Sequence, residues 1–368
     1  MINKERMLNT FMEYVKIESE TKNEKAIGER IIADLKELGL EVYTDNAGKK
    51  LNSNGNNIYC YVPGTTESEA MLFSAHMDTV TPGAGIEPYV DGDYIKSNGD
   101  TILGGDDKSG VVAILEALRI IKEQNLPHRP IEIVFTICEE GGVNGVKEVE
   151  FQRLKAKKGI VLDSGKGPGH IITEAPGQTR IYAEVHGKTA HAGACPEAGI
   201  SAIMAAAEAV STMKLLRIDS ETTANIGTFK AEGPTNIVSP LVEIVAEARS
   251  RSVDKLNEQT EHMINRLKES CEKYGAKLEY KIENCYYSYV LDPEDEHIKT
   301  ISGVCESLNL EVVKLPSGGG SDANVFNLNG IKAINIGTGM ELVHTTDERL
   351  KIEDFINASK VVLKLMTM

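Results

Sequence analysis

Hydrophobic positions along the chain recur first at helical spacing and then in short continuous runs. The helical spacing predicts amphipathic helices at residues 7–17 and 26–39. Four short apolar runs then have the length of buried strands: 57–62, 70–75, 131–138 and 159–162. An amphipathic helix at 107–125 separates the second run from the third. Buried strands separated by helices predict an α/β domain with a mostly parallel, mixed sheet.

The pattern changes near residue 177, where half-exposed strands replace the buried ones. Six elements follow in the order βαββαβ: strand 180–187, helix 199–214, strands 224–233 and 236–250, helix 255–275 and strand 277–287. This order is that of the ferredoxin-like split unit. The segment therefore predicts a separate α+β domain.

The segment after these six elements returns to the first pattern. Asp292 and Pro293 fit the N-cap and first position of a further helix. A strand at 331–337 and a helix at 352–366 follow. We therefore expect one α/β domain in two pieces, 1–176 and 289–368, interrupted by an inserted domain at 177–288.

Composition narrows the classes of function. The 368 residues suffice for two to three domains, and 41% hydrophobic residues suffice for their cores. A net charge of −15 argues against nucleic acid or an anionic membrane as a partner. There is no long apolar run, no signal-peptide pattern at the start, and no Cys-x-x-Cys among the six cysteines. These features predict a cytoplasmic protein with reduced thiols.

Acids and histidines stand where the strands of the first domain are expected to end. They are His76, Asp78, Asp106, Asp107, Glu139, Glu140 and Asp163, and His344 follows near the C-terminus. Each has an ordinary alternative, such as a helix N-cap, a solvated strand end or a histidine paired with an acid. Ligands of open α/β sheets bind at the carboxyl ends of the strands, where these groups would converge. Together they predict a divalent-metal site with nitrogen and oxygen ligands, suited to zinc and also to cobalt or manganese.

The ordered motifs "HMD", "GGDDKSG", "CEEGG", "LDSG" and "VHTT" closely resemble those of a known enzyme family. This family comprises the co-catalytic zinc peptidases and deacylases that include aminoacylase, carboxypeptidase G and peptidase T. The resemblance covers the whole chain, with the inserted lid domain, and is greatest to peptidase T-like aminopeptidases. It implies hydrolysis of short peptides by a water that two metal ions activate.

The resemblance also implies a role for each motif residue. Asp106 would bridge the two metals, His76 and Asp163 would complete the shell of one, and Glu140 and His344 that of the other. Glu139 would be the general base. Asp78 would hold the His76 ring in the tautomer that binds metal.

By the same resemblance, the inserted domain supplies a donor to the reaction and forms a homodimer. The motif "HGKTAHAG" places that donor at His191, which in dimeric relatives reaches the active site of the neighbouring subunit. A sheet with a free edge strand also favours pairing with a two-fold partner. We interpret His186, at the end of the preceding strand, as structural.

Substrate recognition is carried over in the same way. Arg249 and Asn236 would hold carboxylate or carbonyl groups, and the loop with Gly319 and Ser321 matches the family's substrate loop. Peptidase T has an arginine where this chain has Gly318, so one clamp for the carboxyl end of a peptide is missing. Strict tripeptide specificity is therefore not expected.

Three alternatives compete with this interpretation. The run "GKGPGH" at 165–170 looks like a phosphate loop, but a strand rather than a helix is expected after it. A non-catalytic metal-binding dimer would be expected to have lost Glu139, which is present. An aminoacylase or amidohydrolase acting on N-acyl amino acids shares the same site chemistry and remains open.

Overall fold

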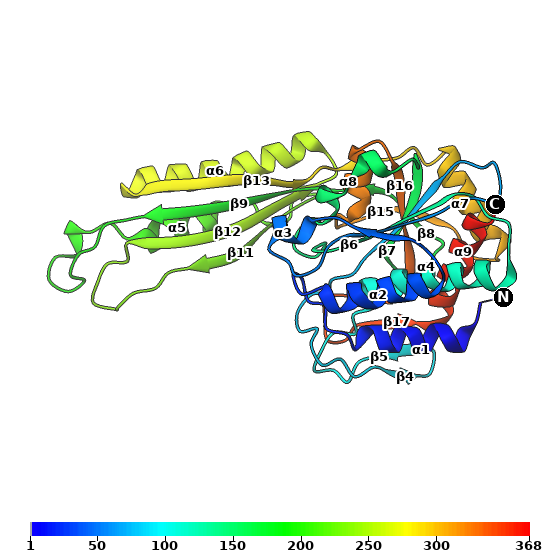
Figure 1. Ribbon diagram of the computed structural model, residues 1–368. Coiled ribbons are helices and arrows are strands. Elements are labelled where there is room, and N and C mark those ends of the chain that lie inside the picture. Colours follow the sequence, from blue (N-terminus) through cyan, green and yellow to red (C-terminus); the bar gives the residue numbers. More distant parts are fainter. Residues whose placement is uncertain (1) are drawn as a thin grey trace. The chain divides into compact units, whose positions relative to one another are not determined.

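The computed structural model describes residues 2–368, which divide into two compact units (Figure 1). The α/β unit comprises the residues up to Glu174, together with Val290–Ser317 and Ser321–Met368. The inserted unit comprises Ala175–Tyr289 and the short loop Gly318–Gly320. The chain therefore has an α/β unit in pieces and a second unit within it.

The α/β unit is built on a mixed sheet whose main path runs β1-β2-β6-β3-β7-β16-β17-β5-β4. Its strands are β1 Val42–Thr44, β2 Ile58–Val62, β3 Met71–His76, β4 Tyr89–Asp91, β5 Tyr94–Lys96, β6 Ile131–Thr136, β7 Lys158–Gly165, β16 Lys332–Glu341 and β17 Arg349–Lys351. Three strands lie off this path: β8 His170–Ala175, β14 Tyr289–Val290 and β15 Val313–Pro316.

Parallel pairing is concentrated in the centre of this sheet. Strands β6, β3, β7 and β16 are parallel to their neighbours in that order. The outer pairs β1–β2, β2–β6, β16–β17, β17–β5 and β5–β4 are antiparallel. The predicted mixed α/β sheet is confirmed, with the parallel part forming its buried middle. The carboxyl ends of β3, β6 and β7 consequently lie along one edge.

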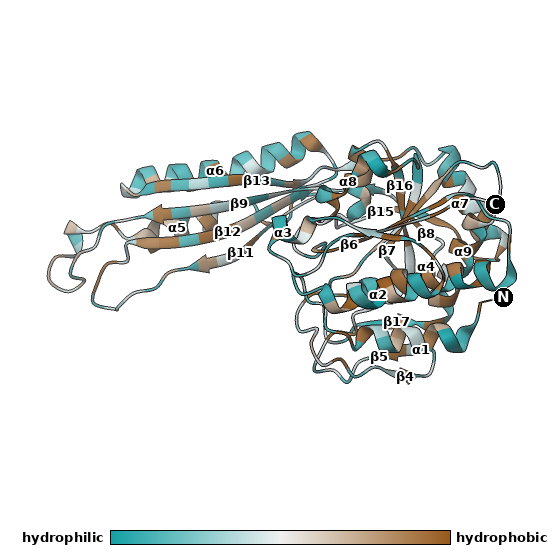
Figure 2. Ribbon diagram, viewed as in Figure 1, coloured by the Kyte–Doolittle hydropathy of each residue, from teal (hydrophilic) through white to brown (hydrophobic). Residues whose placement is uncertain are grey.

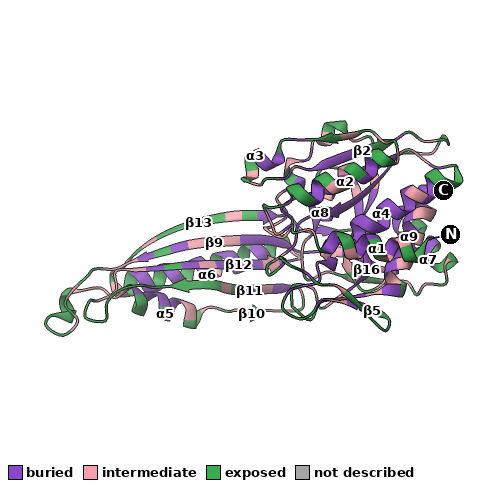
Figure 3. Cartoon of the chain, turned by 60° about the horizontal axis from the view of Figure 1, so that its bottom comes forward, coloured by how far each residue is buried: buried purple, intermediate pink, exposed green. Residues whose placement is uncertain are grey.

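The helices of the α/β unit cover this sheet, and α4 is the most deeply buried (Figure 3). They are α1 Lys4–Val15, α2 Lys25–Glu37, α3 Ala47–Leu51, α4 Gly105–Gln124, α7 Glu296–Ser307, α8 Asp322–Leu328 and α9 Ile352–Met366. Two short 3₁₀ turns lie at Val146–Glu148 and Phe151–Arg153. Helix α4 packs against β3 and β7 and between α1 and α9, so its first residues are held near the strand ends.

The inserted unit is a five-stranded antiparallel sheet with two helices. Its elements are β9 Gly177–His186, a 3₁₀ turn Pro196–Ala198, α5 Ala202–Thr212, β10 Leu216–Arg217, β11 Thr222–Lys230, β12 Leu241–Ser250, α6 Val253–Tyr274 and β13 Lys277–Tyr286. The sheet order β10-β11-β12-β9-β13 is the ferredoxin-like order with a short extra strand. Alternate residues of β9 and β12 pack with α5 and α6 into one core, and Figure 2 shows this alternation of hydrophobic and polar positions.

The helix after the inserted unit begins later than the sequence predicts. Helix α7 begins at Glu296, and its N-cap is Asp295, whose Oδ1 accepts a hydrogen bond of 2.8 Å from the N–H of His297. Asp292 and Pro293 instead form a preceding turn, in which the N–H of Asp295 donates to the carbonyl of Asp292 over 2.9 Å. Two capping signals follow one another here, and the second one starts the helix.

The described residues form no helix that is both long and apolar enough to cross a membrane. All six cysteines are free, and five of them are buried.

Two helical glycines should respond oppositely to the same substitution. A Cβ on Gly110 in α4 would lie 2.5 Å from the Leu162 carbonyl of β7, whereas one on Gly28 in α2 would lie 3.7 Å from Ile58 Cδ1. We expect Gly110→Ala to lower the free energy of unfolding by roughly 1–3 kcal/mol through overpacking. Gly28→Ala should raise it by roughly 0.5–1 kcal/mol, because alanine loses less backbone entropy. Urea unfolding measures both, and a stable Gly110→Ala variant would show that α4 is not held tightly on the sheet.

Candidate metal centre

The five predicted ligands converge at the carboxyl edge of the α/β sheet. His76 ends β3, Asp163 lies near the end of β7, and Asp106 lies at the start of α4. Glu140 follows β6, and His344 lies in the loop between β16 and β17. Segments far apart in the sequence therefore bring two imidazoles and three carboxylates together.

Asp106 lies between the two histidines. Its Oδ1 is 3.0 Å from His76 Nε2, and its Oδ2 is 3.3 Å from His344 Nε2. Asp106 has non-helical backbone angles (φ −80°, ψ 102°) within the first turn of α4. Each carboxylate oxygen thus faces a different imidazole, which is the arrangement that a bridging ligand requires.

The other two carboxylates each lie beside one histidine. Asp163 Oδ1 is 3.7 Å from His76 Nε2, and Glu140 Oε2 is 3.0 Å from His344 Nε2. The cluster therefore separates into two halves, His76 with Asp163 and His344 with Glu140, that share Asp106.

Asp78 organises the site through its backbone carbonyl as well as through its carboxylate. His76 Nδ1 lies 2.9 Å from the backbone carbonyl of Asp78 and 3.6 Å from its Oδ1, so the main chain orients the ring. The carboxylate is fully buried and accepts the N–H of Glu139 at 2.8 Å, the N–H of Glu140 at 3.2 Å and the hydroxyl of Thr21 at 2.7 Å. The carboxylate that is expected to hold His76 thus lies beside its ring and also fixes the main chain of the two glutamates.

Glu139 is buried directly before Glu140 and interacts electrostatically with His76 and Asp163, and Glu24 holds its main chain from a second side. Cys138, directly before it, has a positive φ of 53°. The fully buried Glu24 accepts the N–H of Cys138 over 3.1 Å and the N–H of Lys22 over 2.8 Å. Strained backbone that its surroundings hold in place is typical of active sites. The sequence analysis missed Glu24, because an acid just before a helix is normally solvated.

Crowding of the carboxylates shifts the proton affinities of the whole cluster. Burial, reinforced by the charge of Asp106, raises the pKa of Asp163 to about 8. Burial raises the pKa of Glu139 well above its usual value, and the charges of Asp163 and Glu140 act in the same direction. Hydrogen bonds to Asp106 and Glu140 raise the pKa of His344 to about 10. The cluster therefore gathers protons unless another positive charge takes their place.

The donor set fits divalent cations. His76, Asp106 and Glu140 offer ligand atoms that lie within 4.8 Å of one another, and so do His76, Asp107 and Asp163. Asp107 is already engaged, because its oxygens accept the N–H groups of His76 and Gly110 at 3.2 Å each.

One carboxylate oxygen of Glu140 independently indicates that this cluster binds a further group. Its Oε1 is buried and has no hydrogen-bond partner anywhere in residues 2–368. A buried carboxylate oxygen normally has a partner, and a metal ion would provide one. The geometry and the chemistry of these residues therefore fit a two-ion site.

The structure places His191 and Asn236 side by side in the inserted unit, both exposed. His191 pairs with Ile237 in an isolated bridge, and the N–H of Ala192 donates to the Asn236 carbonyl over 2.9 Å. His191 Nδ1 accepts the N–H groups of Gly193 and Ala194 at 3.1 and 3.0 Å. Its proton therefore resides on Nε2, which is available as a donor.

Arg249 is already paired within the inserted unit. Its Nε is 2.9 Å and its Nη2 3.2 Å from the two carboxylate oxygens of Glu247. Its Nη1 would lie 3.8 Å from a Cβ placed on Gly319, so the glycine loop passes close to the guanidinium. Ser321, in the α/β unit, caps α8 through a reciprocal capping box with Asn324. Its hydroxyl is therefore already engaged in capping α8.

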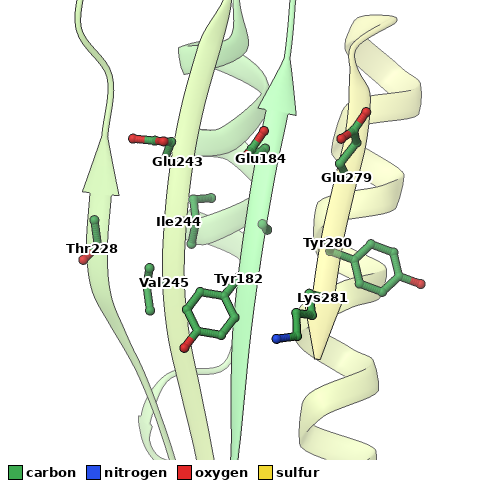
Figure 4. A pocket seen from close by; sticks show the side chains of 10 residues that line it. Tyr182, Glu184, Thr228, Glu243, Ile244, Val245, Glu279, Tyr280 and Lys281 are labelled. Atoms are coloured by element: carbon green, nitrogen blue, oxygen red, sulfur yellow. The ribbon is translucent and has the colours of Figure 1, made fainter. Parts of the chain in front are cut away.

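A second group of acids lies on the sheet of the inserted unit. Figure 4 shows Glu243, Glu184 and Glu279 abreast on β12, β9 and β13, at the side of an open groove. His186 Nε2 lies 3.1 Å from Glu184, and Lys277 Nζ lies 2.6 Å from Glu279. These exposed, cation-paired carboxylates are typical of a solvated sheet face, and His186 keeps its structural interpretation.

A mixed α/β sheet with a cluster of imidazoles and carboxylates at the carboxyl ends of its strands is an arrangement that metal-dependent hydrolases use. The family model described as Peptidase family M20/M25/M40 matches residues 72–368. The chain therefore belongs to this family of metallohydrolases, and the predicted family is confirmed.

Similar proteins cover the whole chain. YqjE of Bacillus subtilis is 39% identical over 366 residues, which are 100% of this chain and 99% of YqjE. The crystal structure of a tripeptidase from Staphylococcus aureus has a TM-score of 0.93 at 40% identity, and that of aminopeptidase PepT from Bacillus cereus has 0.88 at 39%. Each of these two alignments covers 100% of this chain and 98% of the other. The fold, with its inserted unit, is shared along its full length.

Asp163→Asn should change how stability depends on pH in the metal-free chain. The pKa of Asp163 is about 8 in the folded chain, against ~3.9 for an unfolded aspartate. Its carboxyl group therefore favours folding at low pH, and this contribution is lost as the pH rises through about 8. In chelator, the melting temperature of Asp163→Asn relative to wild type should rise from pH 5 to pH 9. The exposed Asp100→Asn is the control, and a difference that is constant with pH would contradict the charge crowding.

Proposed function

We propose that the chain is a metal-dependent peptidase that hydrolyses amide bonds in short peptides and acts as a peptidase T-like aminopeptidase. The observation that carries this proposal is Asp106 between two histidines, with the buried Glu139 beside them. Peptides are favoured as substrates because the two solved relatives at about 40% identity are described as an aminopeptidase and a tripeptidase.

Two divalent ions per chain, zinc in the first place with cobalt or manganese as alternatives, would be held by the five converging residues. His76 and Asp163 would hold one ion, Glu140 and His344 the other, and Asp106 both. When bound, such a pair acidifies a water molecule and polarises the carbonyl group that is attacked. The unpartnered Glu140 Oε1 and the raised pKa of Asp163 support this assignment, since each carboxylate lacks the positive partner that its ionised form needs.

Glu139 would move the proton. One of its carboxylate oxygens would accept a proton from the attacking water and return it to the nitrogen of the leaving amine. Its backbone N–H is anchored to the buried carboxylate of Asp78, which fixes where this carboxyl group starts. Burial among acids raises the pKa of Glu139, and bound cations would bring it back to the ionised form that a base needs.

Residues of the inserted unit, together with Ser321 of the α/β unit, would provide recognition. His191 Nε2–H would donate to the developing oxyanion, and Arg249 with Asn236 and the loop at Gly319 and Ser321 would contact polar groups of the substrate. Arg249 must exchange Glu247 for a substrate carboxylate, or bind it alongside. With Gly318 in place of the peptidase T arginine, we expect broader length tolerance than in a strict tripeptidase.

The test is a substrate panel. Zinc-loaded protein is assayed against di-, tri- and tetrapeptides with free amino termini, beside N-acetyl amino acids. Release of the first residue from short peptides supports the proposal, whereas preference for N-acetyl amino acids would replace it with the aminoacylase alternative.

Glu139→Gln should retain bound metal and lose ~10²–10⁴-fold in turnover, because glutamine cannot accept the proton of the attacking water. Near-normal turnover in that variant would reassign the base.

We further propose that the chain is a cytoplasmic homodimer formed through the inserted unit, with His191 acting in the site of the partner subunit. The test mixes two inactive variants, Glu139→Gln and His191→Ala, under conditions of subunit exchange. With shared sites, a mixed dimer contains one site with both residues intact, and activity returns. With sites confined to one chain, every site lacks a residue and activity stays at background, as it would for a monomer.

A further inference from the structure

Glu348 is a buried carboxylate that the sequence analysis did not single out. It lies four residues after His344, at the end of the loop between β16 and β17, and only 2% of its surface is exposed. Its Oε2 accepts the N–H groups of Leu103 and Gly104, each at 2.8 Å. Its Oε1 accepts the N–H of Asp106 at 3.0 Å. One side chain thus satisfies three backbone donors that are more than 240 positions away in the sequence.

The segment that Glu348 holds is shaped to receive it. A Cβ on Gly105 would lie 3.0 Å from Glu348 Oε1, so glycine leaves room for the carboxylate. Gly104 adopts φ +72°, which turns its N–H toward the same side chain and which glycine adopts without strain. A glutamate is suited to this place, because its two side-chain oxygens can together accept several N–H groups.

The two segments that Glu348 joins both carry residues of the candidate metal centre. The segment 103–106 ends in Asp106, and the loop of Glu348 carries His344. Within that loop the N–H of Glu348 donates to the carbonyl of Thr345 over 3.1 Å, which ties the glutamate to the residue after His344. The separation of 3.3 Å between Asp106 Oδ2 and His344 Nε2 therefore depends on the hydrogen bonds by which Glu348 connects the two segments.

We propose that Glu348 is a positioning residue that sets the distance between Asp106 and His344, and with it the affinity of the ion that these two residues share with Glu140. This inference rests on the ligand set in the proposed function, but not on the substrate. Residues behind metal ligands typically contribute ~10–100-fold in metal affinity. Glu348 would do so through the main chain of Asp106 and not through a ligand side chain.

The burial of Glu348 would also fit a role in stability alone. Glu132 is the matched control that separates such a role from an effect on metal binding. Glu132 is also a buried glutamate (4% exposed) whose oxygens accept backbone N–H groups. Its donors are Lys155, at 2.8 and 3.0 Å, and Ala156, at 2.9 Å. It lies near the start of β6, at the opposite end of the strand from Glu139. Removal of either glutamate leaves backbone donors without their partner, but of the two only Glu348 contacts the segment that carries Asp106.

The experiment compares Glu348→Ala, Glu348→Gln and Glu132→Ala as full-length, chelator-stripped proteins. Cobalt is titrated in against a competing chelator, and the visible spectrum of bound cobalt reports the ligand geometry. Wild type and Glu132→Ala should each bind two ions alike. Glu348→Ala should bind the second ion ~10–100-fold more weakly, with an altered spectrum. Glu348→Gln, with one accepting oxygen left, should fall between them.

Gly105→Ala tests the same connection from the other side, should Glu348→Ala fail to fold. Its methyl group would press on Glu348 Oε1, and the second ion should again be weakened. The inference is overturned if the Glu348 variants bind both ions as wild type does, or if Glu132→Ala weakens them equally. Wild type that binds only one ion would overturn the ligand set of the proposed function, and this inference with it.

Discussion

Crowding of negative charge in a buried place is the constraint on which the α/β unit depends. Asp106, Glu140 and Asp163 lie together around the imidazoles of His76 and His344, and the buried Glu139 directly precedes Glu140. Carboxylates so close to one another cannot all be ionised in a poorly solvated site unless cations compensate them. Without metal, some of these carboxyl groups are therefore protonated. Binding of cations would allow all of them to ionise.

A second set of buried acids holds the main chain around these crowded carboxylates through hydrogen bonds. Asp78, Glu24 and Glu348 are buried, and each accepts two or more backbone N–H groups, at least one of which belongs to a candidate ligand or base or to the residue directly before it. Charged hydrogen bonds to N–H groups are strong and short. The segments with Asp106, Glu139 and Glu140 are thereby fixed before any ion binds. Such preorganisation is what a two-ion site needs, because ligand geometry must not be lost when the protons leave.

The sequence predicted most of the elements and the convergence of the candidate ligands because both leave local signals. Apolar runs that end in His76, Glu139 or Asp163 mark strands and their carboxyl ends, and parallel pairing of β6, β3 and β7 brings those ends together. What the sequence could not provide were contacts between distant segments. Glu348 follows a loop and looks solvated, although its partners lie near Leu103. The hydrogen bond from the His76 ring goes to a backbone carbonyl, which no side-chain motif reveals. The predicted start of α7 was wrong for a different reason: the side chains of Asp292 and Asp295 both accept backbone N–H groups, so either could have been the N-cap.

The central claim is that Asp106 joins two metal ions. Anomalous diffraction from zinc-loaded crystals, recorded on both sides of the zinc absorption edge, tests it directly. The account predicts two zinc peaks about 3.5–4 Å apart, one on either side of the Asp106 carboxylate. One peak should lie beside His76 and Asp163, and the other beside Glu140 and His344. A single fully occupied peak in catalytically active protein, or two peaks of which only one contacts Asp106, would contradict it.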